Sequence, residues 1–103
     1  MAKEPQIIEG ILLDESHSYT LIELVEMCVV DNNTVIEMMD YGIIDPIGKQ
    51  EEQWVFTANA VVRSQKALRL HHDLNIDWAG ISLALDLLDE IETLRAELGA
   101  IKR

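Results

Sequence analysis

Residues 19–42 have the sequence YTLIELVEMCVVDNNTVIEMMDYG, which carries the start and stop signals of two short helices. Thr20 and Glu23 have the spacing of a capping box, in which the hydroxyl and the carboxylate satisfy each other's free backbone amides, so we expect a first helix over Leu21–Cys28. Asp31 is placed to cap a second helix of about ten residues that ends at the closing glycine. The short gap between the two helices is typical of a helix-turn-helix.

The sequence that follows predicts a β-hairpin wing and two further helices. Residues 43–56 have β-prone ends around a middle that contains proline, glycine and charged residues, which is typical of a hairpin. Thr57 is placed to cap a third helix, and Asn75 can end that helix in the left-handed conformation. Asp77 is then placed to cap the last helix.

We therefore predict a mainly α-helical, winged helix-turn-helix fold that occupies residues 1–103 as one domain. The helix-turn-helix and wing are assigned to residues 19–56, the third helix to residues 57–75 and a long C-terminal helix to residues 77–101. The chain is 49% apolar, which is ample for one packed core. The apolar segment 7–13 is interpreted as an extended piece that can pair with the wing.

The C-terminal helix carries more apolar positions than one core needs. One row repeats at alternating spacings of three and four residues, which is typical of coiled-coil contact, and we call it the heptad row: Ala84, Leu87, Ile91, Leu94 and Leu98. Ile101 extends it. A second row lies on an adjacent stripe: Trp78, Ile81, Leu85 and Leu88. A helix of about 25 residues would overhang so small a domain, so we prefer dimerisation to a wide core-facing helix in a monomer, and predict an antiparallel or two-fold symmetric homodimer.

The charge of the chain is concentrated in its first half. Residues 1–56 hold twelve acidic side chains against two lysines, whereas residues 57–103 hold seven acids against six bases, and the net charge is −11. DNA is a dense row of phosphates that proteins bind with Lys and Arg, so this first half is expected to be repelled from DNA. A basic protein partner would be attracted. The alternative is that the acidity only keeps a small protein soluble.

Five acids in and beside the first two helices are the candidate partner-binding residues. Their spacing makes a shared acidic face plausible, and we call them the five acids: Glu23, Glu26, Asp31, Glu37 and Asp40. Taken singly, each is more often a solvated surface carboxylate. Trp54, Phe56 and Trp78 are other candidate contacts, but aromatic residues at such positions more often pack in the core.

For the remaining candidate sites, a structural role is preferred over a functional one. Arg63, Lys66 and Arg69 form a basic stripe, for which pairing with acids of the same chain or of a dimer mate is preferred over phosphate contact. The sequence His71-His72-Asp73 suggests a metal site. However, the side chains of adjacent residues on a helix diverge by about 100° and cannot bind one ion together. Cys28 is interpreted as core filling. We expect no metal, no cofactor and no enzyme activity, since no phosphate loop or acid-base pair is present.

The order of elements resembles the MerR-type winged-helix regulators. The resemblance rests on Tyr19-Thr20 at the first helix, residues 42–46 after the second and residues 75–78 between the last two, and it covers about residues 19–98. Where the MerR-like pattern has basic residues and two tyrosines at the start of the second helix, residues 33–38 here read Asn-Thr-Val-Ile-Glu-Met. DNA recognition, which the resemblance would otherwise imply, is therefore the less favoured hypothesis.

A closer resemblance is to the chaperone-modulator, or CbpM-like, branch of this superfamily. It rests on residues 54–56, 68–74, 77–81 and 84–91, and it extends over nearly the whole chain. The resemblance implies that the protein binds the J-domain of a CbpA-type co-chaperone and inhibits its co-chaperone and DNA-binding activities. The alternative function is a MerR-like dimeric DNA-binding transcription regulator. No apolar run is long enough to span a membrane, and we expect a cytoplasmic protein.

Overall fold

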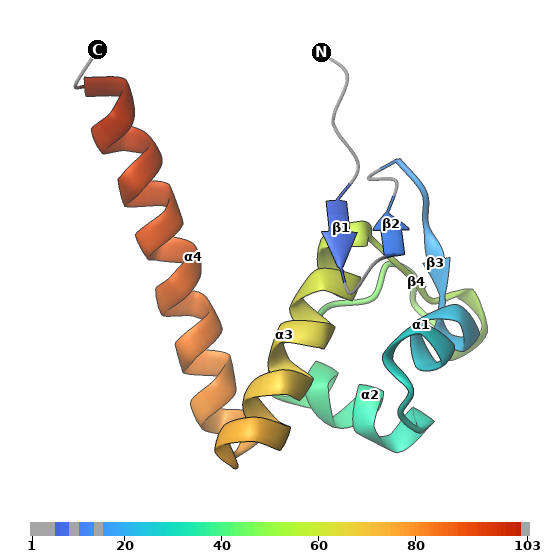
Figure 1. The fold of residues 1–103 in the computed structure, drawn as a ribbon. Helices are drawn as coiled ribbons and strands as arrows, with labels where there is room; N and C mark the ends of the chain where they lie inside the picture. Colours follow the sequence, from blue (N-terminus) through green and yellow to red (C-terminus); the bar gives the residue numbers. More distant parts are fainter. Residues whose placement is uncertain (1–5, 9–10, 14–15, 102–103) are drawn as a thin grey trace.

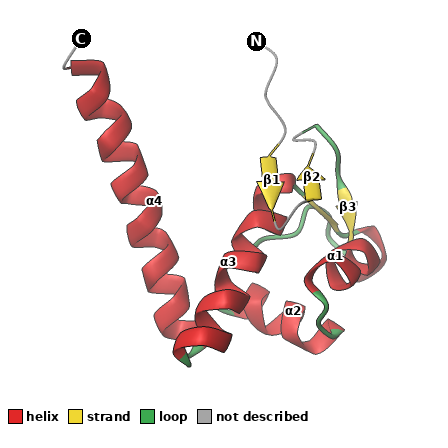
Figure 2. Ribbon diagram, viewed as in Figure 1, coloured by secondary structure: helices red, strands yellow, loops and turns green. Residues whose placement is uncertain are grey.

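The computed structural model describes residues 6–8, 11–13 and 16–101, and it is mainly α-helical (Figures 1 and 2). The helices are α1 Leu21–Cys28, α2 Asn32–Asp40, α3 Ala58–Leu74 and α4 Trp78–Ile101. The strands are β1 Gln6–Ile8, β2 Ile11–Leu13, β3 Tyr19–Thr20 and β4 Val55–Phe56, with a 3-10 turn, η1, at Glu51–Gln53. The predicted mainly α-helical fold is confirmed.

The predicted helix starts are confirmed at the level of single hydrogen bonds. The Thr20 amide donates to Glu23 Oε1 at 3.0 Å, and the Glu23 amide donates to Thr20 Oγ1 at 3.1 Å, which completes the capping box of α1. The Asp31 carboxylate accepts the Thr34 amide at the start of α2, at 2.9 Å. Thr57 caps α3 in the same way. These side chains replace the backbone acceptors that the first turn of a helix lacks.

The wing is smaller than the predicted hairpin. α2 ends at Asp40 and is followed by Gly42 with φ +71°, as expected, but the two arms of the wing meet only at the bridge between Ile47 and Val55. At Gly48, whose φ is +119°, a Cβ atom would lie 2.7 Å from the backbone oxygen of Gln53. The turn therefore requires glycine at this position.

The pairing predicted for residues 7–13 is wrong. β1 and β2 pair with each other, antiparallel, with Gln6 opposite Leu13 and Ile8 opposite Ile11. The strand that pairs with β4 at the end of the wing is β3, with Tyr19 opposite Phe56. Pairing within 6–13 closes a much shorter loop than pairing with the wing, so it costs less chain entropy.

The core lies between the helix-turn-helix and α3, and the start of α4 closes it. Leu24 from α1, Val35 and Met38 from α2, and Phe56 from β4 are fully buried. Val61 and Ala67 of α3 join them, as do Ile81 and Leu85 of α4. Apart from the smaller Ala67, each of these side chains contributes about 1.5–3 kcal/mol when fully buried.

The start of α4 is tied to the end of α2 by polar contacts. Trp78 Nε1 donates to Glu37 Oε2 at 3.0 Å, and Ser82 Oγ donates to the Tyr41 carbonyl at 2.8 Å. α4 remains in contact with α3 as far as Asp89, and its later turns run clear of the other helices (Figure 1). Every residue from Asp86 to Ile101 is exposed. No helix in the described part of the chain has the length and hydropathy needed to cross a membrane.

Candidate functional site

The candidate surface is the acidic face formed by α1 and α2. The two helices lie next to each other at one end of the molecule, away from the free half of α4 (Figure 1). Neither helix has a basic residue in its last turn, and the sequence from residue 4 to residue 48 contains no lysine or arginine. The carboxyl end of each helix adds its own partial negative charge to this face.

Two of the five acids have structural roles in helix caps. Glu23 belongs to the capping box of α1, and its second oxygen lies 3.9 Å from His17 Nε2. Asp31 Oδ1 accepts the Thr34 hydroxyl at 2.6 Å in addition to the Thr34 amide. The backbone hydrogen bond from Thr20 lowers the pKa of Glu23, and the side-chain hydrogen bond from Thr34 lowers that of Asp31. Changes at these two positions would alter the fold as well as the surface charge.

These caps predict a loss of stability in acid. Both pKa values are lower in the folded chain than in the unfolded chain, so the stabilisation is present above the unfolded pKa and is lost as the pH falls through the folded one. We expect the Tm to fall as the pH drops below about 4. Asp31→Asn keeps a capping side chain but removes the titration, so its Tm should depend less steeply on pH in thermal melts monitored by circular dichroism. If the Tm of Asp31→Asn depended on pH as steeply as that of the unaltered protein, the titrating role of the Asp31 cap would be wrong.

The other three acids differ in whether their carboxylates already make hydrogen bonds within the chain. Glu37 is exposed, but one of its oxygens accepts the Trp78 indole. Glu26 and Asp40 are also exposed, and neither makes a hydrogen bond or ion pair with any residue that the structure describes. Glu26 and Asp40 are therefore the two members of the five acids whose carboxylates are fully available to a partner.

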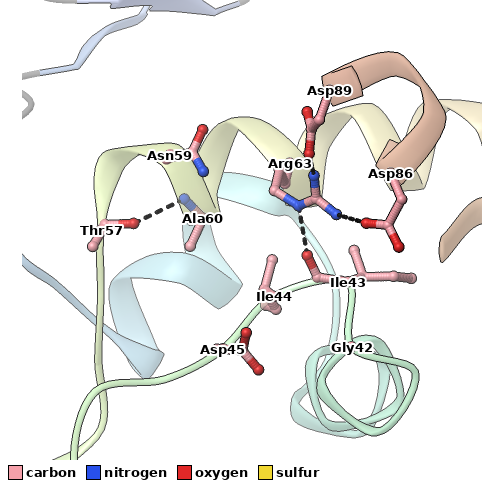
Figure 3. Close-up of a pocket in the computed structure, with 10 residues that line it drawn as sticks. All are labelled: Gly42, Ile43, Ile44, Asp45, Thr57, Asn59, Ala60, Arg63, Asp86 and Asp89. Carbon is pink, nitrogen blue, oxygen red and sulfur yellow. Dashed lines mark hydrogen bonds and ion pairs between the residues drawn. The ribbon is translucent and has the colours of Figure 1, made fainter. Parts of the chain in front are cut away.

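Arg63 connects α3 to the segment that follows α2 and to α4 (Figure 3). Its Nε donates to the Ile43 carbonyl at 2.7 Å, and its guanidinium pairs with Asp86 and Asp89 of α4. The Arg63 side chain is 14% exposed, whereas the two carboxylates are more than half exposed. The preference for internal pairing of the basic stripe is thus confirmed at Arg63, which fixes the position of α4 relative to the helix-turn-helix.

The Arg63 contacts line a hollow of about 380 Å³ between α3, α4 and the segment after α2 (Figure 3). Its polar groups are Asp45, Thr57, Asn59 and the Arg63 contacts themselves. Within the described residues no cluster of three or more His, Cys, Asp or Glu could hold a metal ion. The Arg63 guanidinium is already satisfied by three internal acceptors, so this hollow offers no unpaired cation for an anionic ligand.

The aromatic residues pack internally, as preferred. Phe56 is fully buried, Trp54 packs against the core, and Trp78 is 9% exposed. His71 stacks on Trp78 with ring centroids 4.2 Å apart, and its Nδ1 lies 2.8 Å from the Ile76 carbonyl. Sequence reasoning missed the bond between Trp78 and Glu37, because two residues so far apart in the chain carry no local signal of contact.

The two apolar rows of α4 have different environments. Trp78, Ile81 and Leu85 of the second row are buried against the core, but Leu88 is 47% exposed. Most of the heptad row remains exposed, with values between 45% and 55% for Leu87, Ile91, Leu94 and Leu98, while Ala84 is partly buried. An exposed apolar stripe of this length is typical of an interaction surface rather than of a monomer's solvated face.

Comparison with known proteins places the chain in a family. The family described as MerR HTH family regulatory protein matches residues 19–103. A protein of Pseudomonas entomophila named chaperone modulatory protein CbpM is 40% identical over 74 residues, which are 72% of this chain and 73% of that protein. A Coxiella burnetii protein of the same name is 35% identical over 98 residues, covering 95% of this chain and 92% of its own length. The chain belongs to the CbpM family.

Membership of the CbpM family confirms both resemblances drawn from the sequence, and with them the MerR-like winged helix-turn-helix fold. In this CbpM-family chain, α2 occupies the position of the second helix of the helix-turn-helix, but its charged side chains are Glu37 and Asp40. The charged side chains of α2 are therefore acidic where DNA binding would need cations.

Proposed function

We propose that this CbpM-family protein modulates a chaperone system by binding the J-domain of a CbpA-type co-chaperone. The single observation that carries the proposal is the acidic α1–α2 face, where Glu26 and Asp40 have no hydrogen-bond or ion-pair partner among the described residues. The resemblance implies a J-domain partner, and J-domains engage their chaperone through a basic helix. An acidic protein of this size would cover that helix and inhibit both the co-chaperone activity and the DNA binding of the partner.

The mechanism we propose is competitive masking rather than chemistry. Opposite charges raise the rate of encounter and set the orientation of the two proteins, while a few desolvated apolar contacts supply most of the affinity. All five acids are proposed contributors. Glu26 and Asp40 are the direct contacts, Glu37 contributes through its remaining oxygen, and Glu23 and Asp31 add to the field while they hold the helix starts in place.

We also propose that the protein acts as a homodimer joined through the heptad row of α4. Four of its five side chains are about half exposed and lie beyond the part of α4 that packs on the core. A two-fold symmetric pairing of these helices would bury them at spacings suited to coiled-coil contact. The Trp78 and Ser82 contacts hold α4 against the end of α2. Dimerisation would therefore place two acidic faces at a fixed distance and orientation.

The proposal predicts binding to an isolated J-domain but not to DNA. In calorimetric titrations of the purified protein, we expect saturable binding to the J-domain of a CbpA-type co-chaperone, weaker at physiological salt than at low salt. A random duplex DNA as parallel ligand should give no binding. Binding to the duplex with none to the J-domain would overturn the proposal and favour the alternative function, a dimeric DNA-binding regulator.

A further inference from the structure

A second hollow, distinct from the one at Arg63, lies between the end of α1 and the middle of α3. It has a volume of about 340 Å³ and is lined by Met27, Cys28 and Val29 from the helix-turn-helix and by Gln65, Leu68, Arg69 and Asp73 from α3. We call it the α1–α3 groove. Its lining combines apolar residues with the polar side chains of Gln65, Arg69 and Asp73.

Gln65 gives the groove an unusual chemical feature. The residue is only 6% exposed, and its Nε2 donates to the Met27 carbonyl at 3.4 Å. Its other side-chain atom, Oε1, is buried and accepts no hydrogen bond from any described residue. A buried acceptor without a donor is unfavourable, and because Gln65 lines the groove, a turn of its amide toward the groove would let a ligand satisfy this oxygen.

The α1 side of the groove favours a positively charged ligand. α1 ends here with the partial negative charge of its dipole, and no basic residue in its last turn compensates it. Asp73 adds a carboxylate to the lining. Arg69 also lines the groove, but it already interacts within the chain and lies one helical turn from Asp73, so the two charges offset each other. The chain as a whole carries a net charge of −11.

Val29, which lines the groove, has a backbone conformation that is unfavourable for valine. It has φ +56° and ψ +50°, the left-handed conformation that β-branched residues rarely adopt, and its side chain is 87% exposed. An exposed valine in this conformation is disfavoured both by backbone strain and by solvation. The same position in α3, Asn75, uses a residue that tolerates the left-handed region.

We propose that the α1–α3 groove binds a lysine or arginine side chain of the basic partner. The aliphatic stem would pack against Val29 and Leu68, and the charged head would donate to Gln65 Oε1. This inference deepens the proposed function, because it identifies the kind of side chain that anchors the basic helix beside the acidic face. A neutral apolar side chain would fill the groove without satisfying the buried oxygen.

The first experiment tests the groove without the partner protein. The ¹⁵N-labelled protein is titrated with Nα-acetyl-lysinamide and, as a matched apolar probe, with Nα-acetyl-norleucinamide. We expect saturable shifts of the Gln65 side-chain amide and of the Met27 and Val29 backbone amides with the lysine probe, and smaller shifts with the norleucine probe. Equal shifts with both probes, or none with the lysine probe, would overturn the assignment of a cationic ligand.

The second experiment uses the J-domain and two variants of the groove. Gln65→Met keeps the length of the side chain but removes the acceptor, so its Tm should stay the same or rise while the J-domain affinity falls about tenfold, as for one hydrogen bond to a charged group. Val29→Gly relieves the left-handed strain, so it should raise the Tm and still weaken binding. Gln53→Met, the same change at an exposed position of η1, is the matched control and should bind normally.

The outcomes separate this inference from the proposed function. If the unaltered protein binds the J-domain and both Gln65→Met and Val29→Gly bind as tightly, the groove proposal is wrong although the proposed function stands. If the unaltered protein does not bind the J-domain, the proposed function fails, and the titration with Nα-acetyl-lysinamide alone decides whether the groove binds a cation. Should Gln65→Met fail to fold, Val29→Gly and the probe titration decide the question.

Discussion

The double variant Glu26→Lys, Asp40→Lys is expected to bind the J-domain of a CbpA-type co-chaperone about 100-fold more weakly than the unaltered protein at low salt. Each reversal replaces an attraction by a repulsion, for which we assign about 1.4 kcal/mol per position, a factor of ten each. The Tm should change little, because both carboxylates are exposed and neither makes a hydrogen bond or ion pair with another described residue. Calorimetric titration and a thermal melt of the same sample measure the two quantities.

The controls for this prediction separate local charge from net charge. Glu92→Lys with Glu97→Lys changes the net charge by the same amount on exposed positions of α4, outside the heptad row, and should weaken binding much less. The difference between the two double variants should shrink as salt is raised, because exposed charges are screened within about 10 Å at 0.1 M. Equal losses of affinity for both variants would mean that the α1–α2 face is not the contact surface.

The structure accounts for why the helices could be predicted closely. Their start signals are local, since Thr20 and Glu23, Asp31 and Thr34, and Thr57 and Ala60 are pairs three residues apart whose hydrogen bonds depend only on a helical turn. The heptad row is also a local pattern. Elements of this kind can be identified from spacing alone, and all four helices were predicted on that basis.

The contacts between distant segments could not be predicted in the same way. The strand that pairs with β4 was expected in residues 7–13, but it is β3, because several short apolar segments satisfy the pattern of a strand equally well. For the candidate site, the acidic face stays a prediction, and the hydrogen bond between Glu37 and Trp78 was not predicted. Gln65 was missed entirely. The sequence signal for Gln65 is only that a polar residue stands four positions after Val61, on the buried face of α3. An amide at such a position indicates that it contacts another polar group, but it does not identify that group.

The largest effect is expected at the heptad row, where Ile91→Glu with Leu94→Glu should convert the proposed homodimer into monomers. Ile91 is 45% exposed and Leu94 55% exposed, and both lie beyond the part of α4 that packs on the core. A symmetric dimer would bury four such side chains. Because each is already about half buried, each would contribute about half of the 1.5–3 kcal/mol of full burial, so their loss should raise the dissociation constant by about 10²- to 10⁴-fold. Sedimentation equilibrium over a range of protein concentrations measures this change.

The matched control for the dimer is Ile22→Glu, which makes the same apolar-to-acidic change at a side chain of α1 that is 70% exposed and far from the heptad row. It should remain dimeric. The monomeric heptad variant should keep its helical circular dichroism, because Leu24, Phe56 and Ile81 of the core do not depend on the free half of α4. Since each protomer carries a complete acidic face, the monomer should also bind one J-domain. A double variant that stays dimeric, or an unaltered protein that is monomeric at high concentration, would show that the exposed row serves another partner.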